Sequence, residues 1–245
     1  MKITMVIPTY NESENLPKLV KEVLALPLED IHILIVDDNR PDGTGDLAEK
    51  LRVEYNDRIH CLHRAGKMGL GSAYKDGFKK AIEEGADYVG QMDADFSHPI
   101  DKIPEMVEKL ADYDWVIGSR YVKGGKLDEK WPFYRKWLSG FGNSYARIIL
   151  GMKIRDVTGG FKIWKKETLN AMPMDTIKAN GYIFQVEMNY VASKLGFKAA
   201  EVPIYFQERT MGTSKMSLGI SYEAAWRTLT LRSQHKDIKR IKKKA

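Results

Sequence analysis

The sequence predicts an α/β fold built on a mostly parallel sheet with helices on both faces. In the first half of the chain, short apolar runs alternate with segments of helical periodicity, and this βαβαβ order is typical of parallel sheets covered by crossover helices. Polar clusters follow the expected strands, where such sheets bind ligands. The 245 residues, 43% hydrophobic and 29% charged, suffice for a full core. We therefore expect a single domain over residues 1–232 and a basic tail over 233–245.

Each element of the first half follows from a local pattern. Residues 3–7 form a short apolar run that ends at Pro8, and Ser13 opens an amphipathic helix that Pro27 stops after residue 26. Residues 31–36 are a β-branched run followed by a turn rich in Asp, Pro and Gly. The same alternation predicts strands at 59–63, 88–92 and 115–118, and helices at 45–55, 69–84 and 100–110.

The second half of the chain is less regular. Helical periodicity predicts helices over 133–150, 181–195 and 218–232, and residues 199–206 are expected to form a strand. A turn-rich stretch at 156–161 and a polar loop at 209–215 lie between these elements. We find no internal repeat, low-complexity segment or linker, which favours one domain.

The composition excludes several classes of protein. A single cysteine, Cys61, rules out an intrachain disulfide framework and favours a reducing compartment. No run approaches the roughly 20 apolar residues that span a bilayer, and the first residues resemble a strand rather than a signal peptide. The net charge of +6 is concentrated in the tail, which fits either a solvated helix end or attraction to an anionic membrane. We expect no nucleic-acid partner, because no aromatic residues are interleaved with the basic ones.

Two carboxylates, Asp93 and Asp95, come one residue apart at the end of the strand expected at 88–92. Residues i and i+2 of an extended strand face the same side, so these side chains could converge on one hard divalent cation. Such a cation stabilises a leaving diphosphate. The alternative is an ordinary acidic turn, because D-x-D alone is a weak pattern.

Two further strand ends carry polar residues. Asp37 and Asp38 should face opposite ways, so we expect one to contact a base or ribose and the other to cap the turn, although a plain turn fits equally well. Tyr10 could stack on a base, or its segment could simply begin a helix.

The segment His60-Cys61-Leu62-His63 invites a zinc interpretation. Strand alternation, however, puts Cys61 and His63 on one side and His60 on the other. No second cluster in the sequence completes four ligands, so we interpret the segment as an ordinary strand.

Four basic residues lie in or beside loops: Arg120, Arg135, Arg209 and Lys215. The planar guanidinium of arginine suits phosphate, although a single such residue is more often a surface ion-pair partner. Together with the acidic pair, they indicate a site that holds two phosphorylated molecules.

Five motifs in this order carry a family resemblance: IPTYNE at residues 7–12, VDDNRPDGT at 36–44, MDADFSHP at 92–99, GSRY at 118–121 and RTMGTSK at 209–215. The set spans nearly the whole chain and resembles the GT-A-fold inverting nucleotide-sugar glycosyltransferases. Among them it most resembles the dolichol-phosphate (polyprenol-phosphate) mannose synthases. The resemblance implies the GT-A fold, with residues 1–232 as a single catalytic domain.

The resemblance also implies roles for the matching residues. A guanosine pocket would be lined by Pro8, Tyr10, Glu12, Val36 and Asp38. The nucleotide diphosphate would be held by Asp93, Ala94 and Asp95, and Mg²⁺ or Mn²⁺ by Asp93, Asp95 and Ser97. Phosphates of the sugar nucleotide and of the acceptor would contact Arg120, Arg209 and Lys215, with Arg135 as a further acceptor contact. The catalytic set would be Asp95, Arg120 and Arg209.

The implied reaction is metal-dependent transfer of mannose from GDP-mannose to a polyprenyl (dolichyl) monophosphate with inversion. The enzyme would be peripheral at the cytoplasmic face of a membrane. Residues 218–232 and the basic tail, or a small membrane-anchoring subunit, would supply the membrane contact. Two alternatives stay open: a UDP-glucose-dependent polyprenyl-phosphate glucosyltransferase, and a non-catalytic membrane-surface binding module.

Overall fold

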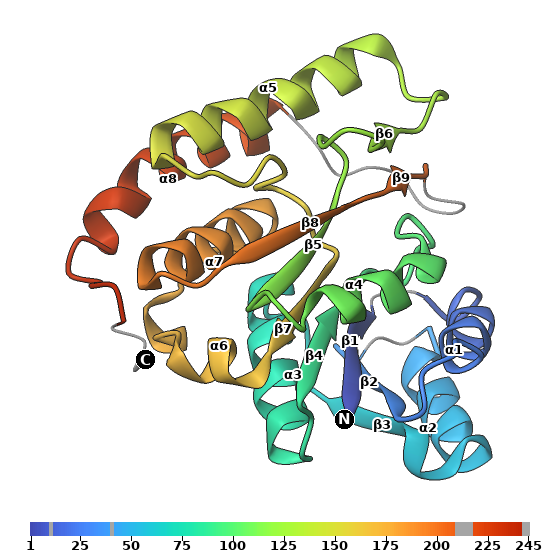
Figure 1. The fold of residues 1–245 in the computed structure, drawn as a ribbon. Helices are drawn as coiled ribbons and strands as arrows, with labels where there is room; N and C mark the ends of the chain where they lie inside the picture. Colours follow the sequence, from blue (N-terminus) through green and yellow to red (C-terminus); the bar gives the residue numbers. More distant parts are fainter. Residues whose placement is uncertain (10–11, 40–41, 209–217, 242–245) are drawn as a thin grey trace.

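A seven-stranded sheet forms the centre of the molecule, with strand order β3-β2-β1-β4-β7-β5-β8 (Figure 1). The computed structural model describes residues 1–9, 12–39, 42–208 and 218–241, with the backbone alone described over 218–224. The strands of the sheet are β1 (Ile3–Thr9), β2 (Ile31–Asp37), β3 (Ile59–His63), β4 (Tyr88–Gln91), β5 (Trp115–Ser119), β7 (Lys162–Lys165) and β8 (Ala199–Pro203). The apolar runs of β1, β2 and β5 are buried on both faces, as expected for strands covered by helices.

Strand β7 runs antiparallel to both of its neighbours, β4 and β5. The other pairs of this sheet are parallel, which confirms the mostly parallel sheet expected from the sequence. Strand β7 is not among the elements expected from the sequence. Its four residues begin and end with lysine, so they present neither an apolar run nor a period-2 pattern long enough to recognise.

The single strand expected at 199–206 is divided into two. β8 ends at Pro203, and β9 (Tyr205–Phe206) leaves the main sheet to pair with β6 (Lys126–Leu127). The backbone N–H of Gln207, just past β9, donates to the carbonyl of Ser97 at 3.3 Å. The small second sheet therefore brings the chain beside the turn that follows β4.

Helices cover both faces of the sheet, and the expected helices are confirmed with small shifts at their ends. They are α1 (Leu16–Leu24), α2 (Thr44–Glu54), α3 (Leu70–Glu83), α4 (Ile103–Lys109), α5 (Phe133–Leu150), α6 (Lys166–Ala171), α7 (Tyr182–Leu195) and α8 (Leu218–Gln234). Short 3₁₀ turns occur at η1 (Asn56–Arg58), η2 (Ile100–Lys102) and η3 (Met174–Thr176). Helix α6, which was not expected, directly follows β7.

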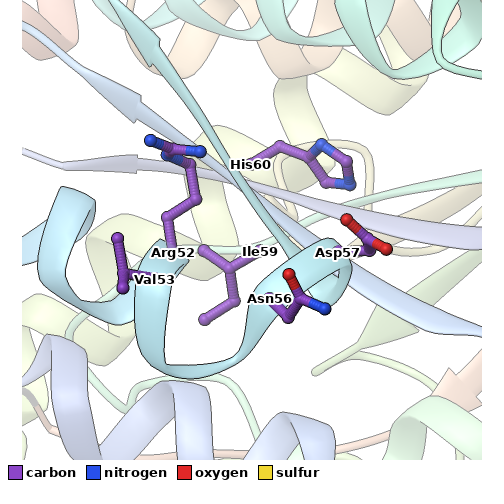
Figure 2. Close-up of a pocket in the computed structure, with 6 residues that line it drawn as sticks. All are labelled: Arg52, Val53, Asn56, Asp57, Ile59 and His60. Carbon is purple, nitrogen blue, oxygen red and sulfur yellow. The ribbon is translucent and has the colours of Figure 1, made fainter.

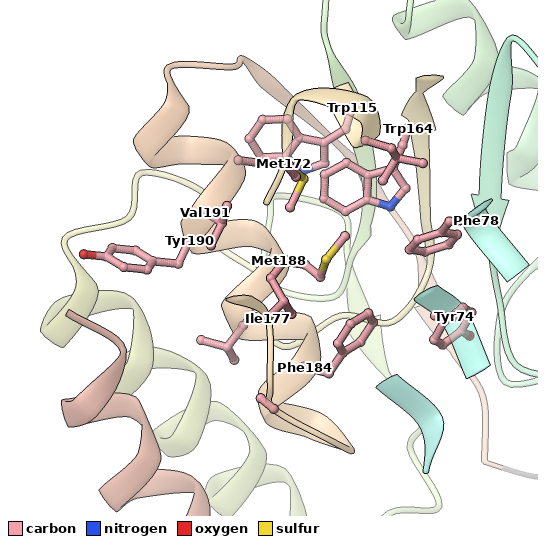
Figure 3. Packing of buried hydrophobic residues seen from close by; sticks show 14 of the residues in the cluster. Tyr74, Phe78, Trp115, Trp164, Met172, Ile177, Phe184, Met188, Tyr190 and Val191 are labelled. Atoms are coloured by element: carbon pink, nitrogen blue, oxygen red, sulfur yellow. The ribbon is translucent and has the colours of Figure 1, made fainter. Parts of the chain in front are cut away.

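Each face of the sheet has its own apolar core, because consecutive strand residues point to opposite faces. On β1, Val6 belongs to the core beneath α3 and α7, whereas Met5 and Ile7 belong to the core beneath α1, α2 and α4. In the core beneath α3 and α7, the rings of Trp115 and Trp164 stack with centroids 5.4 Å apart (Figure 3).

Helices α5 and α8 pack against each other beyond α7 (Figure 1). α8 also contacts α7, so this pair forms an outer layer over one core. Across the described part of the chain, no helix combines the length and apolarity needed to cross a membrane.

Candidate active site

The carboxyl ends of β1, β2, β4 and β5 lie at one edge of the sheet. β1 runs parallel to β2 and to β4, and β5 shares their direction because β7 is antiparallel to both β4 and β5. The polar turns that follow these strands therefore meet at one edge, as the sequence predicts.

Asp93 and Asp95 lie in a turn, so the expected strand alternation was the wrong reason for placing them together. β4 ends at Gln91, before either carboxylate. Asp93 and Asp95 are positioned by separate contacts instead. The Tyr74 hydroxyl donates to Asp93 Oδ1 at 3.3 Å, and Asp95 Oδ1 accepts from the backbone N–H of Ser97 at 3.1 Å.

Asp93 and Asp95 both affect the pKa of the buried Tyr74 hydroxyl. Burial raises the pKa of Tyr74 well above its usual range, and the negative charges of Asp93 and Asp95 raise it further. The phenol therefore stays a neutral hydrogen-bond donor, and the two carboxylates share one region although no strand aligns them.

The turn offers oxygen ligands that suit a hard divalent cation. Asp95 is 5% exposed, and the Ser97 hydroxyl is buried with no hydrogen-bond partner among the described residues. Phe96, between them, adopts a φ of 57°, which is uncommon for a residue other than glycine and is found at ligand sites more often than elsewhere. Mg²⁺ and Mn²⁺ use one or two carboxylates together with phosphate and water oxygens, so this donor set fits them.

A buried polar network supports β4 behind the turn. Gln91 Nε2 donates to Gln185 Oε1 at 2.7 Å and to the carbonyl of Gly160 at 2.9 Å. Lys162 Nζ donates to the same Gln185 oxygen at 2.7 Å. Burial lowers the pKa of Lys162 well below its usual range, and Asp156 opposes part of that shift. The network joins β4, β7, α7 and the loop 156–161.

Arg120 forms a two-pronged ion pair with Asp156 at the end of β5. Its Nε and Nη2 atoms donate to the two oxygens of Asp156, each at 2.8 Å, and Nη2 also donates to Thr158 Oγ1 at 2.7 Å. The side chain of Asp156 is fully buried and that of Arg120 is 10% exposed. Burial by itself would raise the pKa of Asp156, but the charge and hydrogen bonds of Arg120 outweigh it and hold the pKa below its ordinary value.

The turn after β4, the loop 156–161 and the end of β9 pack together. The ring of His98 stacks on Phe161 with centroids 5.1 Å apart and meets Phe206 edge-on at 5.5 Å. The backbone N–H of Gly118 donates to the carbonyl of Phe161 at 2.9 Å. The turn that carries Asp93 and Asp95 and the end of β5 that carries Arg120 therefore belong to one packed unit.

Arg135 lies on the first turn of α5. Its guanidinium stacks on Trp131 at 3.7 Å from the ring centroid, and Nη1 donates to Glu208 Oε1 at 2.9 Å. Glu208 directly precedes Arg209 in the sequence. Arg135 thus ties α5 to the start of the predicted phosphate loop, and its contact with an acceptor stays a prediction.

Asp37 and Asp38 pair with two consecutive residues at the end of β3. Asp38 Oδ1 accepts from Arg64 Nη1 at 2.7 Å, whereas Asp37 Oδ2 lies 3.2 Å from His63 Nδ1. Burial raises the pKa of Asp38, and Arg64 opposes that shift. Arg64, which also pairs with Asp76 of α3 at 3.0 Å, was missed by the sequence analysis because no local motif marks it.

The remaining predicted nucleotide contacts differ in exposure. The backbone N–H of Glu12 donates to Thr44 Oγ1 at 3.3 Å, which links the turns after β1 and β2. The side chains of Val36 and Ala94 are buried in the two cores, so their backbones are what they can present to a ligand, and Pro8 is half-buried. Three predicted residues lie outside the described residues: Tyr10, Arg209 and Lys215.

The hollow drawn in Figure 2 lies away from this edge. It has a volume of about 290 Å³ and lies where α2, η1 and the amino end of β3 meet. Its lining residues are Arg52, Val53, Asn56, Asp57, Ile59 and His60. None of them is a predicted site residue.

Comparison with known proteins identifies the family. Residues 4–172 match the family described as glycosyl transferase family 2. The chain belongs to glycosyl transferase family 2. One relative, the undecaprenyl-phosphate mannosyltransferase of Micrococcus luteus, is 45% identical over 225 residues, which cover 91% of each chain. Another, the polyprenol monophosphomannose synthase of Mycolicibacterium smegmatis, is 43% identical over 215 residues, or 87% of this chain and 80% of that one.

Solved structures of other glycosyltransferases share the fold of this family 2 member. The glucosyl-3-phosphoglycerate synthase of Mycobacterium tuberculosis, in complex with Mn²⁺, UDP and glucosyl-3-phosphoglycerate, is 15% identical with a TM-score of 0.62, covering 95% of this chain and 79% of that chain. TarS 1–349 of S. aureus, in complex with UDP, is 14% identical with a TM-score of 0.64, covering 97% and 66%. These likenesses confirm the predicted GT-A fold.

Proposed function

We propose that the protein transfers a mannosyl group from GDP-mannose to a polyprenyl monophosphate, with inversion at the anomeric carbon. The observation that carries this proposal is the 45% identity to the undecaprenyl-phosphate mannosyltransferase over 91% of both chains. The packed carboxyl edge supports it, because an acidic turn and a fixed arginine lie together there. A reaction between two phosphorylated molecules requires such stabilisation of charge.

The turn after β4 suits the diphosphate of the donor. We propose that Asp93, Asp95 and Ser97 hold Mg²⁺ or Mn²⁺, which would supply Lewis-acid stabilisation to the leaving diphosphate. The Ser97 hydroxyl, which has no partner in the described part of the chain, supports this assignment, and the Mn²⁺ in the M. tuberculosis synthase supports the class of ion. The guanosine would lie against the turns after β1 and β2, which the hydrogen bond of Glu12 to Thr44 holds together.

Arg120 suits the role of a fixed hydrogen-bond donor to a phosphate. Asp156 and Thr158 hold its guanidinium in place before any ligand binds, so no reorganisation is needed during the reaction. Because Asp156 balances the charge of Arg120, the guanidinium would orient a phosphate through hydrogen bonds more than it would add net positive charge. We assign the net positive charge around the phosphates to Arg209 and Lys215.

The acceptor phosphate can attack without a dedicated general base. A phosphate monoester has a second pKa near ~6, so it is largely ionised at neutral pH. The protein then has to position the phosphate oxygen in line with the leaving group and exclude water. The buried support of the carboxyl edge, with Gln91 and Lys162 both bonded to Gln185, provides a rigid platform for that alignment.

We propose that α5 and α8 face the membrane that holds the acceptor. On α5, Phe133, Trp137 and Phe141 follow at intervals of four residues and are 81%, 59% and 55% exposed. On α8, Trp226 and Leu229 are also exposed. Aromatic residues beside basic ones are typical of interfacial helices, and α5 also carries Arg135, Lys136 and Arg147. The sequence predicts this contact for residues 218–232 and the tail, and α5 adds a second helix to that surface. The chain's one cysteine, which is free, fits the reducing cytoplasmic side of that membrane.

A donor-by-acceptor transfer assay tests the reaction. We expect mannosyl lipid from GDP-mannose and polyprenyl phosphate with Mg²⁺ or Mn²⁺, and loss of transfer with a chelator. Glucosyl lipid from UDP-glucose alone would show that the donor is wrong. Vesicle binding without transfer from either donor would point to the non-catalytic module.

Vesicle flotation of a Trp137→Ser/Phe141→Ser variant tests the membrane surface. We expect at least a tenfold loss of binding to anionic vesicles, because two large apolar groups no longer enter the interface. Val53→Ser on α2, another exposed apolar site, is the matched control. Equal binding by both variants would contradict the assignment to α5.

A further inference from the structure

Helix α2 and strand β3 gather metal-ligating side chains beside the turn that follows β2. Glu49 of α2 and Cys61 and His63 of β3 each offer one ligand atom, and these atoms all lie within 4.8 Å of one another. The sequence placed Cys61 and His63 on one side of the strand but showed no further ligand. The tertiary structure adds Glu49, which packs over the strand from α2.

The spacing of these atoms suits a tetrahedral ion. With Zn–N and Zn–O near ~2.0 Å and Zn–S near ~2.3 Å, tetrahedral ligands lie about 3.3–3.6 Å apart. Glu49 Oε1 and His63 Nε2 are now 2.9 Å apart, so a small outward movement makes room. The side chains of Glu49 and His63 are 40% and 46% exposed and can make that adjustment without disturbing the core.

His63 lies between two carboxylates. Its Nδ1 is 3.2 Å from Asp37 Oδ2, and its Nε2 is 2.9 Å from Glu49 Oε1. A carboxylate can only accept, so a protonated His63 can donate to both in the metal-free protein. A metal ion between Nε2 and Glu49 would take the place of that proton, while Nδ1–H goes on donating to Asp37. A carboxylate behind the histidine is also the arrangement that orients metal-bound imidazoles.

A hollow beside the cluster is a second indication that a cation binds there. A hollow of about 340 Å³ borders Asp37, Glu49 and His63 and is open to solvent. Asp37 is 2% exposed, and its Oδ1 has no hydrogen-bond partner among the described residues although it is fully buried. Asp46 also lines the hollow, so negative charge is concentrated there. A buried, unpartnered carboxylate oxygen in an acidic hollow is what a bound cation would stabilise.

We propose that Glu49, Cys61 and His63 bind one borderline-soft divalent ion such as Zn²⁺, with Asp37 orienting His63. A thiolate and an imidazole favour Zn²⁺ or Co²⁺ over Mg²⁺, which prefers oxygen. A water molecule from the hollow completes the fourth position. The ion ties α2 to β3 next to the turn that follows β2, and none of its three ligands is a residue assigned to the proposed sugar transfer.

Titration of the full chain with Co²⁺, followed by absorption, tests the site. Because the chain has a single cysteine, a thiolate-to-cobalt charge-transfer band can arise only from Cys61. We expect the band to saturate at one Co²⁺ per chain, to disappear when Zn²⁺ displaces the Co²⁺, and to be absent in Cys61→Ser. Glu49→Gln and His63→Gln should weaken Co²⁺ binding at least tenfold, and Asp37→Asn about 10- to 100-fold.

His60→Gln is the matched control, because His60 lies on β3 but lines the other hollow (Figure 2). It should bind Co²⁺ with wild-type affinity. Circular dichroism of each variant separates loss of binding from loss of folding, and the exposed Glu49 is the variant least able to disturb the fold. The absence of a charge-transfer band in the wild type, or an unchanged affinity in folded Glu49→Gln and His63→Gln, would overturn the proposal.

Discussion

The acidic turn after β4 and the Glu49–Cys61–His63 cluster differ in ligand chemistry and in burial. The turn presents only oxygen atoms, and Asp95 is almost completely buried. The cluster presents oxygen, sulfur and nitrogen, and the side chains of Glu49 and His63 are 40% and 46% exposed. A hard ion with phosphate suits the first region, and a borderline ion suits the second. The two proposed sites should therefore select different ions, because one offers only oxygen ligands and the other offers sulfur and nitrogen as well.

The two regions also differ in what supports them. Buried contacts from distant segments surround the turn, including the Arg120–Asp156 pair and the hydrogen bonds of Gln91. The cluster rests on side chains at the surface of a helix and an edge strand. We therefore expect substitutions around the turn to affect stability and transfer, and those in the cluster to affect metal binding.

The largest expected effect is that of Asp156→Asn. Removing one partner of a buried ion pair leaves Arg120 uncompensated and should lower the free energy of unfolding by about 3–5 kcal/mol. Urea unfolding measures this change. Asp112→Asn, at an exposed position, is the control and should stay within about 0.5 kcal/mol of wild type. Equal stabilities would show that the pair does not support the site.

The next effect is that of Asp95→Ala on catalysis. Loss of a group that stabilises transition-state charge should lower the transfer rate about 10²- to 10³-fold. The cobalt titration of the cluster should be unchanged in this variant, which separates the two regions. Asp101→Ala, a nearby exposed acidic residue, serves as the control. Near wild-type transfer with bound metal would remove Asp95 from the site.

A smaller effect is expected from zinc on stability. An ion that binds only the folded state stabilises it by about 2.7 kcal/mol at 100 times its dissociation constant. Thermal unfolding with Zn²⁺ should show this increase in the wild type and lose most of it in Glu49→Gln. An equal gain in Glu49→Gln would place the binding elsewhere.

The smallest effect is the pH dependence of the stability that Asp156 contributes to the folded protein. Arg120 holds the pKa of folded Asp156 below its ordinary value of ~3.9, so the stabilisation is present above that value and is lost as pH falls through the lowered pKa. Each pKa unit by which folding lowers the pKa of Asp156 corresponds to about 1.4 kcal/mol of unfolding free energy. Acid unfolding of the wild type compared with Asp156→Asn should show this loss below about pH 4 in the wild type alone.

Much of the active-site edge could be predicted from local patterns. The strand ends place Asp38, Asp93 and Arg120 on one edge, and the structure confirms that placement. The partners could not be predicted, because they are distant in sequence. Arg64 is 26 residues from Asp38, and Asp156 is 36 residues from Arg120. The antiparallel β7 was missed for a related reason, since its pairing with β4 and β5 stabilises a segment with no strand pattern of its own.

The sequence by itself determined the alternation of strands and helices, the edge at which the polar turns meet, and the resemblance to sugar-nucleotide transferases. These follow from side-chain periodicity and turn chemistry, which act over a few residues. The tertiary structure alone decided which charges are paired, that Asp93 and Asp95 share a turn rather than a strand face, and that Glu49 joins Cys61 and His63. Those features depend on burial and on contacts between distant segments, and they exist only once the sheet has assembled.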